Sequence, residues 1–175
     1  MSSQLPSNWI TQHCPAPTKG RNRALDLACG KGRNSFWLAK QGWSVTGLDR
    51  DLSQTNMADH PDITWQEADL ETGSWPLGSQ SFDLVIVANY LHRPLFPYLR
   101  DAVRSGGTLI YETFMVGNEA YGRPRSPDFL LYPDELRQAF AGWDICAFKQ
   151  GPIHPDGSTR PTAVKQSIAA KKPSQ

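Results

Sequence analysis

The chain of 175 residues has few cysteines, no long apolar run and no excess of charge of one sign. Its cysteines, Cys14, Cys29 and Cys146, are far apart and form no CxxC pair, so we expect neither a disulfide framework nor a cysteine zinc site. No segment approaches the roughly 18 apolar residues of a transmembrane helix, and residues 1–11 lack the pattern of a signal peptide. These absences predict a soluble, reduced, cytoplasmic protein without a membrane partner.

The charge balance also excludes classes of partner. Eighteen Lys and Arg against seventeen Asp and Glu leave a formal net charge of +1, which argues against a general basic field for nucleic acid or anionic lipid. Aromatic residues make up 10% of the chain and supply large units for a buried core, so intrinsic disorder is not expected. The length fits one domain.

Apolar runs, Gly-rich turns and helical segments alternate along the first two thirds of the chain, which predicts βαβ units. The expected parallel strands are residues 23–28, 43–49, 63–67, 82–88 and 108–114. The expected helices between them are residues 34–41, 52–57 and 94–103. The run 84–88 is apolar without alternation, as in a central parallel strand that is covered on both faces.

The pattern changes after residue 114. A long Gly- and Pro-rich loop is followed by a helix with Pro133 in its first turn and by a hairpin with strands at 143–150 and 162–170. We therefore expect one α/β domain with a doubly wound mixed sheet. Its parts are an N-terminal segment (1–23), a cofactor-binding half (24–114), an acceptor-side loop (115–132) and a C-terminal helix and hairpin (133–170).

The residues Asp26-Leu-Ala-Cys-Gly-Lys-Gly-Arg-Asn-Ser35 form a Gly-rich turn between the first strand and a helix. Such a turn lets the backbone approach a nucleotide-like ligand, and the helix N-terminus offers free N–H groups. The spacing G-x-G-x-x-S lacks the third Gly of the dinucleotide fingerprint. The second strand ends in Asp49, seventeen positions after Gly32, where a carboxylate can accept hydrogen bonds from both ribose hydroxyls.

This turn resembles the D/E-x-G-x-G-x-G motif of class I S-adenosylmethionine-dependent methyltransferases, with Ala28 in place of the first Gly. The string from Leu25 to Ser35, with Gly42 and Asp49 behind it, is similar to small bacterial methyltransferases of the tellurite-resistance type, and the resemblance extends over residues 25–140. It implies a Rossmann-like seven-stranded sheet of order 3-2-1-4-5-7-6, with the last strand antiparallel and helices on both faces.

The resemblance also implies how the cofactor is held. The backbone of the turn would pass under its methionine and ribose parts, Asp26 would orient the amino-acid end, and Asp49 would take the ribose hydroxyls. Asp69 and the Leu70 N–H would bind adenine, and Ala88 and Asn89 would line the wall beside the sulfonium. The predicted cofactor residues are Asp26, Ala28, Gly30, Gly32, Asp49, Asp69, Leu70, Ala88 and Asn89. Each of the three acids can also be read as an ordinary turn or surface residue.

The acceptor is expected beyond the fourth strand. His92 is the candidate general base, although a helix-start residue packed on the sheet has the same pattern. The predicted acceptor residues are Tyr90, Arg93, Tyr121 and Arg123, and a loop with two arginines can clamp an oxyanion or simply be solvated. The histidines show no metal-ligand spacing, so no metal is expected.

The predicted function is transfer of a methyl group from S-adenosylmethionine to a small molecule or metalloid oxyanion, with S-adenosylhomocysteine as product. Nucleic acid is not expected as the acceptor, because the chain is nearly neutral. The fourth strand also ends in Asn89-Tyr-Leu-His92 and not in the D/N-P-P-Y/F of adenine- or glutamine-nitrogen methyltransferases. The chain would act as a monomer or homodimer. The alternatives are a non-catalytic cofactor-binding regulator or partner subunit and a nicotinamide-dependent oxidoreductase, which the missing third Gly disfavours.

Overall fold

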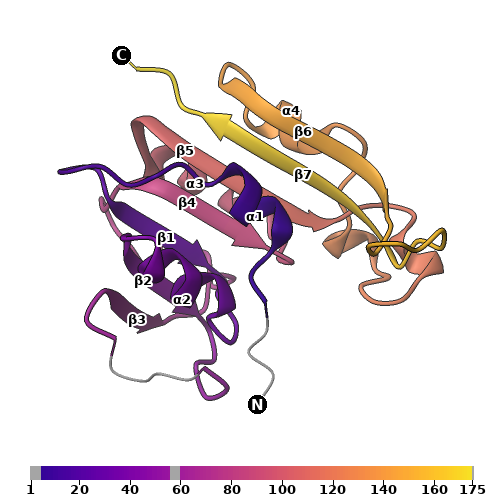
Figure 1. Ribbon diagram of the computed structural model, residues 1–175, viewed down its shortest axis with the longest axis horizontal. Helices are drawn as coiled ribbons and strands as arrows, with labels where there is room; N and C mark the ends of the chain where they lie inside the picture. The colour runs from indigo at the N-terminus through magenta and orange to yellow at the C-terminus, as the bar shows by residue number, and fades with distance from the viewer. Residues whose placement is uncertain (1–4, 56–59, 175) are drawn as a thin grey trace.

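The computed structural model describes residues 5–55 and 60–174, in which seven strands form one sheet of order β3-β2-β1-β4-β5-β7-β6 (Figure 1). The strands are β1 (Arg23–Leu27), β2 (Ser44–Asp49), β3 (Ile63–Glu67), β4 (Phe82–Ala88), β5 (Val103–Phe114), β6 (Asp144–Ile153) and β7 (Ala163–Lys171). The first five pair in parallel, and β7 is antiparallel to both β5 and β6. The predicted order and the antiparallel last strand are confirmed.

Helices cover both faces of the sheet, as predicted. The helices are α1 (Asn8–His13), α2 (Arg33–Lys40), α3 (Phe96–Ala102) and α4 (Glu135–Ala139). In β4, where Phe82–Val87 are buried, Leu84 and Ile86 belong to the cluster with α1 and α2, and Val85 and Val87 to the cluster with α3 and α4. Figure 1 shows these two pairs of helices on opposite faces of the sheet. No helix within residues 5–55 and 60–174 is long and apolar enough to cross a membrane.

Three expectations about the helices and strands differ from the structure. Residues 52–55 form a turn, in which Ser53 N donates to the Asp51 carboxylate at 2.9 Å, and the rest of the helix expected at 52–57 lies outside the described residues. The strand expected at 108 begins at 103, because α3 ends at Ala102 and the chain pairs with Phe82 at once. Pro133 precedes α4 and is not in its first turn, because Asp134 has a left-handed backbone with φ 58°.

Candidate functional site

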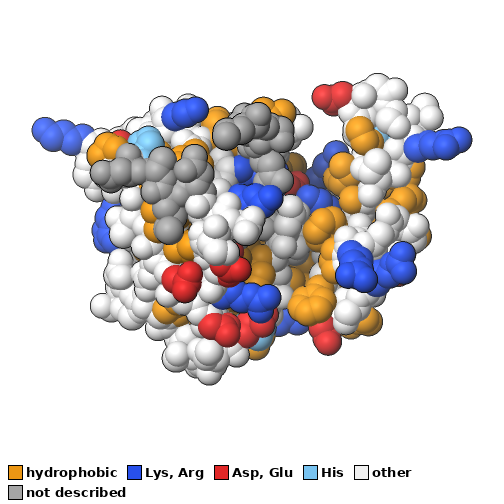
Figure 2. Space-filling view, turned by 90° about the horizontal axis from the view of Figure 1, so that it is seen from below, with side chains coloured by type: hydrophobic (Ala, Val, Ile, Leu, Met, Phe, Trp, Pro, Cys, Tyr) orange, Lys and Arg blue, Asp and Glu red, His pale blue; other side chains and the backbone are white. Residues whose placement is uncertain are grey.

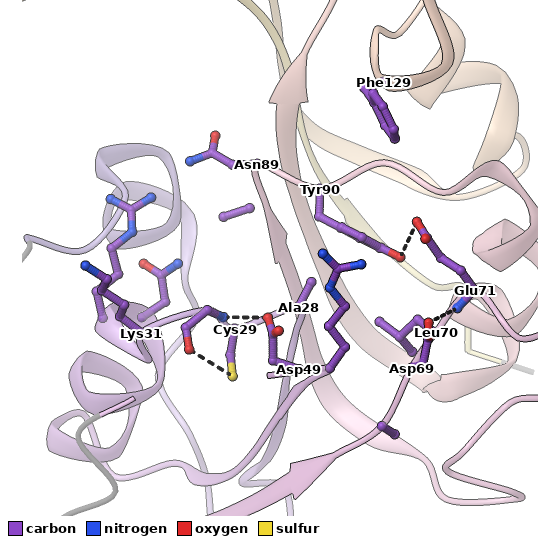
Figure 3. Close-up of a pocket in the computed structure, with 16 residues that line it drawn as sticks. Ala28, Cys29, Lys31, Asp49, Asp69, Leu70, Glu71, Asn89, Tyr90 and Phe129 are labelled. Carbon is purple, nitrogen blue, oxygen red and sulfur yellow. Dashed lines mark hydrogen bonds between the residues drawn. The ribbon is translucent and has the colours of Figure 1, made fainter. Parts of the chain in front are cut away.

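A cavity of about 530 Å³ opens at the carboxyl ends of β1, β2, β3 and β4, the edge where open parallel sheets bind ligands (Figure 3). Its lining is drawn from the turns that follow these strands, from the start of α2 and from the loop after β5. The lining residues are Ala28, Cys29, Gly30, Lys31, Arg33, Asn34, Asp49, Arg50, Ala68, Asp69, Leu70, Glu71, Ala88, Asn89, Tyr90 and Phe129.

The turn after β1 forms one wall. Ala28 has a left-handed backbone with φ 55°, the conformation that glycine adopts most easily, and Gly30 follows with φ 53°. Cys29 N donates to the Leu48 carbonyl at 3.0 Å and so joins the turn to β2. Gly32 lies outside the lining, because it packs against Trp65: a Cβ at Gly32 would lie 2.6 Å from the indole.

The end of β2 places Asp49 beside this turn. One carboxylate oxygen accepts from Gly30 N at 2.8 Å, and the other accepts from Asp51 N at 3.1 Å. A carboxylate has about four acceptor positions, so further hydrogen bonds to a ligand are possible. After β3, the Asp69 carboxylate accepts from Glu71 N at 2.9 Å, and Leu70 is buried in the core below. Asp49, Asp69 and Leu70 therefore meet at the cavity although they come from two strands.

Asn89 and Tyr90 form the wall at the end of β4. Asn89 has φ 56°, its N–H donates to the Glu112 carbonyl at 2.8 Å, and its side-chain oxygen accepts from Lys165 Nζ at 2.7 Å. Burial lowers the pKa of Lys165, whose ammonium also lies 3.8 Å from the Glu112 carboxylate. The Tyr90 hydroxyl donates to Glu71 Oε1 at 3.4 Å (Figure 3), and burial raises the pKa of Tyr90.

Two predicted residues lie behind the lining. Asp26 is buried within β1 and accepts from the Ser35 hydroxyl at 2.6 Å, and burial raises its pKa to about 7. His92 directs Nδ1 toward Glu71 Oε1 at 3.9 Å and precedes the 3₁₀ turn Arg93–Leu95. Neither residue lines the cavity, and their roles toward a ligand remain predictions.

The acceptor-side loop is arranged differently from the prediction. Arg93 does not line the cavity, because its guanidinium pairs with the Glu135 carboxylate at 2.6 Å and donates to two carbonyls of the loop. Tyr121 and Arg123 are exposed and also lie outside the lining. The loop instead brings Phe129 to the cavity. Of the four predicted acceptor residues, only Tyr90 lines it.

Several lining residues were not predicted. They are Cys29, Lys31, Arg33, Asn34, Arg50, Ala68, Glu71 and Phe129. Most are sequence neighbours of predicted residues, so a wider window around each strand end would have included them. Phe129 had no such signal, since it reaches the cavity through the fold of a long loop. Within residues 5–55 and 60–174, no group of three or more His, Cys, Asp or Glu side chains is placed to hold a metal ion.

The start of α2 joins the cavity to the N-terminal segment. Asn34 Oδ1 accepts from Ser7 N at 3.0 Å, and the Arg33 guanidinium donates to the Leu5 carbonyl at 3.0 Å. The Ser7 hydroxyl also donates to Glu112 at 2.9 Å. Trp9 follows in α1 and donates its indole N–H to the Ile168 carbonyl at 3.2 Å, so it packs on β7 and does not cover the cavity.

Known proteins resemble this chain over part of their length. Residues 24–107 match a family model described as a methyltransferase domain. The chain is 33% identical over 124 residues to the tRNA U34 carboxymethyltransferase of Methylococcus capsulatus, covering 65% of this chain and 38% of that protein. It is 26% identical over 167 residues to hemagglutinin 1 of Eikenella corrodens, covering 86% and 55%. The chain thus spans less than two thirds of the length of either relative.

Solved structures share the fold at low identity. TehB from Haemophilus influenzae superposes with a TM-score of 0.68 at 19% identity, over 87% of this chain and 58% of that one. An S-adenosylmethionine-dependent methyltransferase from Mesorhizobium loti gives 0.72 at 20%, over 93% and 95%. The glycopeptide N-methyltransferase MtfA in complex with S-adenosylmethionine gives 0.64 at 19%, over 94% and 91%. The match over residues 24–107, the strand order and the position of the cavity at the strand ends show that the chain has the fold of these solved methyltransferases.

Proposed function

We propose that this chain transfers the methyl group of S-adenosylmethionine to a small-molecule acceptor by in-line displacement and releases S-adenosylhomocysteine. The observation that carries the proposal is one cavity whose lining includes residues from the ends of four neighbouring strands: Ala28 with Gly30, Asp49, Asp69 with Leu70, and Ala88 with Asn89. Its volume of about 530 Å³ falls within the range of small-molecule sites. The methyltransferase fold and the solved complex of MtfA with the same cofactor support it.

The residues of the cavity fit this cofactor. Asp49 retains acceptor capacity for the ribose hydroxyls beyond its bonds to two backbone N–H groups. Asp69 can accept from the adenine amino group. Lys31 and Arg33, which line the cavity at the start of α2, supply positive charge for the cofactor's carboxylate.

The protein's part in the reaction is to position the groups and exclude water. The sulfonium of the bound cofactor supplies the activated methyl carbon, so the chain needs no universal acid–base pair. Lys165 fixes the side-chain oxygen of Asn89 and thereby orients its amide at the cavity wall. His92 is the proposed general base for acceptor deprotonation; its Nδ1 lies 3.9 Å from Oε1 of Glu71, which lines the cavity.

A small acceptor fits the charge of the cavity better than a nucleic acid. Three cationic side chains in the lining are matched by three carboxylates, whereas a phosphate backbone is bound by a stripe of positive charge. Figure 2 shows Lys and Arg interspersed with Asp and Glu over the face it displays. The three free cysteines, Cys14, Cys29 and Cys146, support a location in the reducing cytoplasm, where we propose that the protein acts as a monomer or homodimer.

Titration calorimetry with S-adenosylhomocysteine tests the cofactor site. Asp49→Ala is expected to weaken binding by about 2–4 kcal/mol, because two charge-assisted hydrogen bonds to the ribose are lost. Asp49→Asn should lie between this variant and the wild type. Asp62→Ala, which removes an exposed acid before β3, should bind normally.

Three outcomes would contradict the proposal. Wild-type affinity in Asp49→Ala would exclude the ribose role, and binding of NADH in preference to S-adenosylhomocysteine would favour an oxidoreductase. Tight cofactor binding without methyl transfer to any acceptor of a metabolite panel would instead indicate a non-catalytic regulator.

A further inference from the structure

Phe129 is an exposed aromatic residue that the loop holds at the cavity. Its side chain is 49% exposed although it belongs to the lining, whereas the next two residues, Leu130 and Leu131, are buried. In the view of Figure 3, Phe129 projects from the loop above Tyr90, and Tyr90 lies between it and the acids Asp49 and Asp69. The loop therefore places its leucines in the core and leaves one aromatic ring available to a ligand.

Hydrogen bonds on both sides of Phe129 fix this position. The Arg93 guanidinium donates to the Asp128 carbonyl at 3.3 Å and to the Leu130 carbonyl at 2.8 Å, and so brackets Phe129. The same guanidinium makes two bonds to Glu135, at 2.6 and 3.0 Å. A bidentate Arg–carboxylate pair restrains both partners, so the half-exposed ring stands on a rigid support.

The same contacts argue against an anionic acceptor on this side of the cavity. Glu135 neutralises Arg93, and the two arginines of the loop, Arg123 and Arg125, lie outside the lining. What the loop offers to the cavity is an aromatic surface. The second ring in the lining, Tyr90, is restrained by its bond to Glu71. Rings prefer offset or edge-to-face contact with other rings.

We propose that Phe129 is the binding surface for the methyl acceptor and that the acceptor is a small molecule with an aromatic ring close to its nucleophilic atom. This inference rests on the proposed function and specifies its substrate class. Arg93 is the positioning residue for Phe129. The loop therefore offers the acceptor a contact with an aromatic ring, where the sequence predicted two arginines that clamp an oxyanion.

Matched neutral probes test the proposal. Benzyl alcohol and cyclohexylmethanol carry the same hydroxymethyl group and differ in the ring alone. Their dissociation constants are measured by NMR titration of the protein saturated with S-adenosylhomocysteine. The wild type is expected to bind benzyl alcohol roughly two- to tenfold more tightly, the preference that an added aromatic contact gives.

Two substitutions at residue 129 test whether the preference for the aromatic probe depends on Phe129. Phe129→Ala should abolish it and Phe129→Tyr should retain it, both with unchanged affinity for S-adenosylhomocysteine. Ile145→Ala, which removes a 42% exposed apolar side chain from the edge strand β6, should behave as the wild type.

Equal binding of the two probes by the wild type, or a preference that survives in Phe129→Ala, would overturn the proposal while leaving the cofactor site intact. Failure of the wild-type chain to bind S-adenosylhomocysteine would overturn the proposed function itself, so the two failures are distinguishable.

Discussion

Ala28 and Asn89 are at the ends of β1 and β4, and each has a left-handed backbone with φ near 55°. Among the described residues, the one other non-glycine residue with positive φ is Asp134, before α4. Asparagine tolerates this conformation, whereas for alanine it costs about 1–2 kcal/mol. Both residues line the cavity, so unfavourable backbone conformations are concentrated where the ligand is proposed to bind.

Glycine substitutions test the strain at Ala28. Ala28→Gly should leave the free energy of unfolding within about 1 kcal/mol of the wild type, because relief of the left-handed conformation offsets the entropy that glycine loses on folding. Ala24→Gly, at a buried position within β1, has no strain to relieve and should lose about 1 kcal/mol or more. Urea unfolding measures both, and equal losses would show that Ala28 is unstrained.

For single residues, the sequence predicts those that reach the cavity because they directly follow a strand. It does not predict those that are held at the cavity by contacts with residues far away in the chain. Ala28, Asp49 and Asn89 reach the cavity because parallel strands end at one edge. Arg93 and Phe129 were not predictable in the same way, since the partner of Arg93 is Glu135, 42 positions away, and that pairing fixes the loop.

Helix α4 shows how one element is held by another. It has five residues, and its N-cap, Asp134, makes no side-chain capping bond. The buried Gln166 of β7 takes this role, because its oxygen accepts from Leu136 N at 2.8 Å and its amide donates to the Tyr132 carbonyl at 3.0 Å. The antiparallel strand β7 therefore positions both the helix and the end of the acceptor-side loop.

Gln166→Leu is expected to destabilise the protein by about 1–3 kcal/mol, because a similar volume is kept while the buried Leu136 N–H loses its acceptor. Gln138→Leu, at an exposed position of α4, should change the free energy of unfolding by less than about 0.5 kcal/mol. Thermal and urea unfolding measure the difference. Similar stabilities for the two variants would contradict a capping role for Gln166.

Strands were predicted better than helices, for a physical reason. The central strands carry unbroken apolar runs such as Leu84–Ala88, and burial on both faces determines this pattern. The region 52–55 has no comparable apolar face, and the Asp51 side chain offers the backbone a competing hydrogen bond. The sheet order itself came from the family resemblance, since the alternation of elements does not determine it.

The whole molecule should respond to pH through Asp26. Burial raises the pKa of this carboxyl from an ordinary 3.8 to about 7. Between these values the folded state binds the proton more strongly than the unfolded state, so the free energy of unfolding falls as pH rises from about 4 to 7 and then levels off.

The charge-free variant Asp26→Asn lacks this dependence. From pH 5 to pH 8, the wild type should lose roughly 2–3 kcal/mol more of its unfolding free energy than Asp26→Asn does. Urea unfolding at each pH measures the difference, with the exposed Asp144→Asn as a control that follows the wild type. Parallel pH curves for wild type and Asp26→Asn would show that Asp26 is not protonated in the folded state.

The indole of Trp65 fills the space that a Cβ would need at two glycines, Gly32 and Gly47. A Cβ at Gly32 or Gly47 would lie 2.6 Å from its ring atoms, so both positions exclude any larger residue while the tryptophan is present. The last glycine of the turn, the glycine of β2 and the tryptophan of β3 thus form one steric unit. In the evolution of related chains, these three positions should vary together, and a smaller residue at 65 should appear before a side chain is accepted at 47.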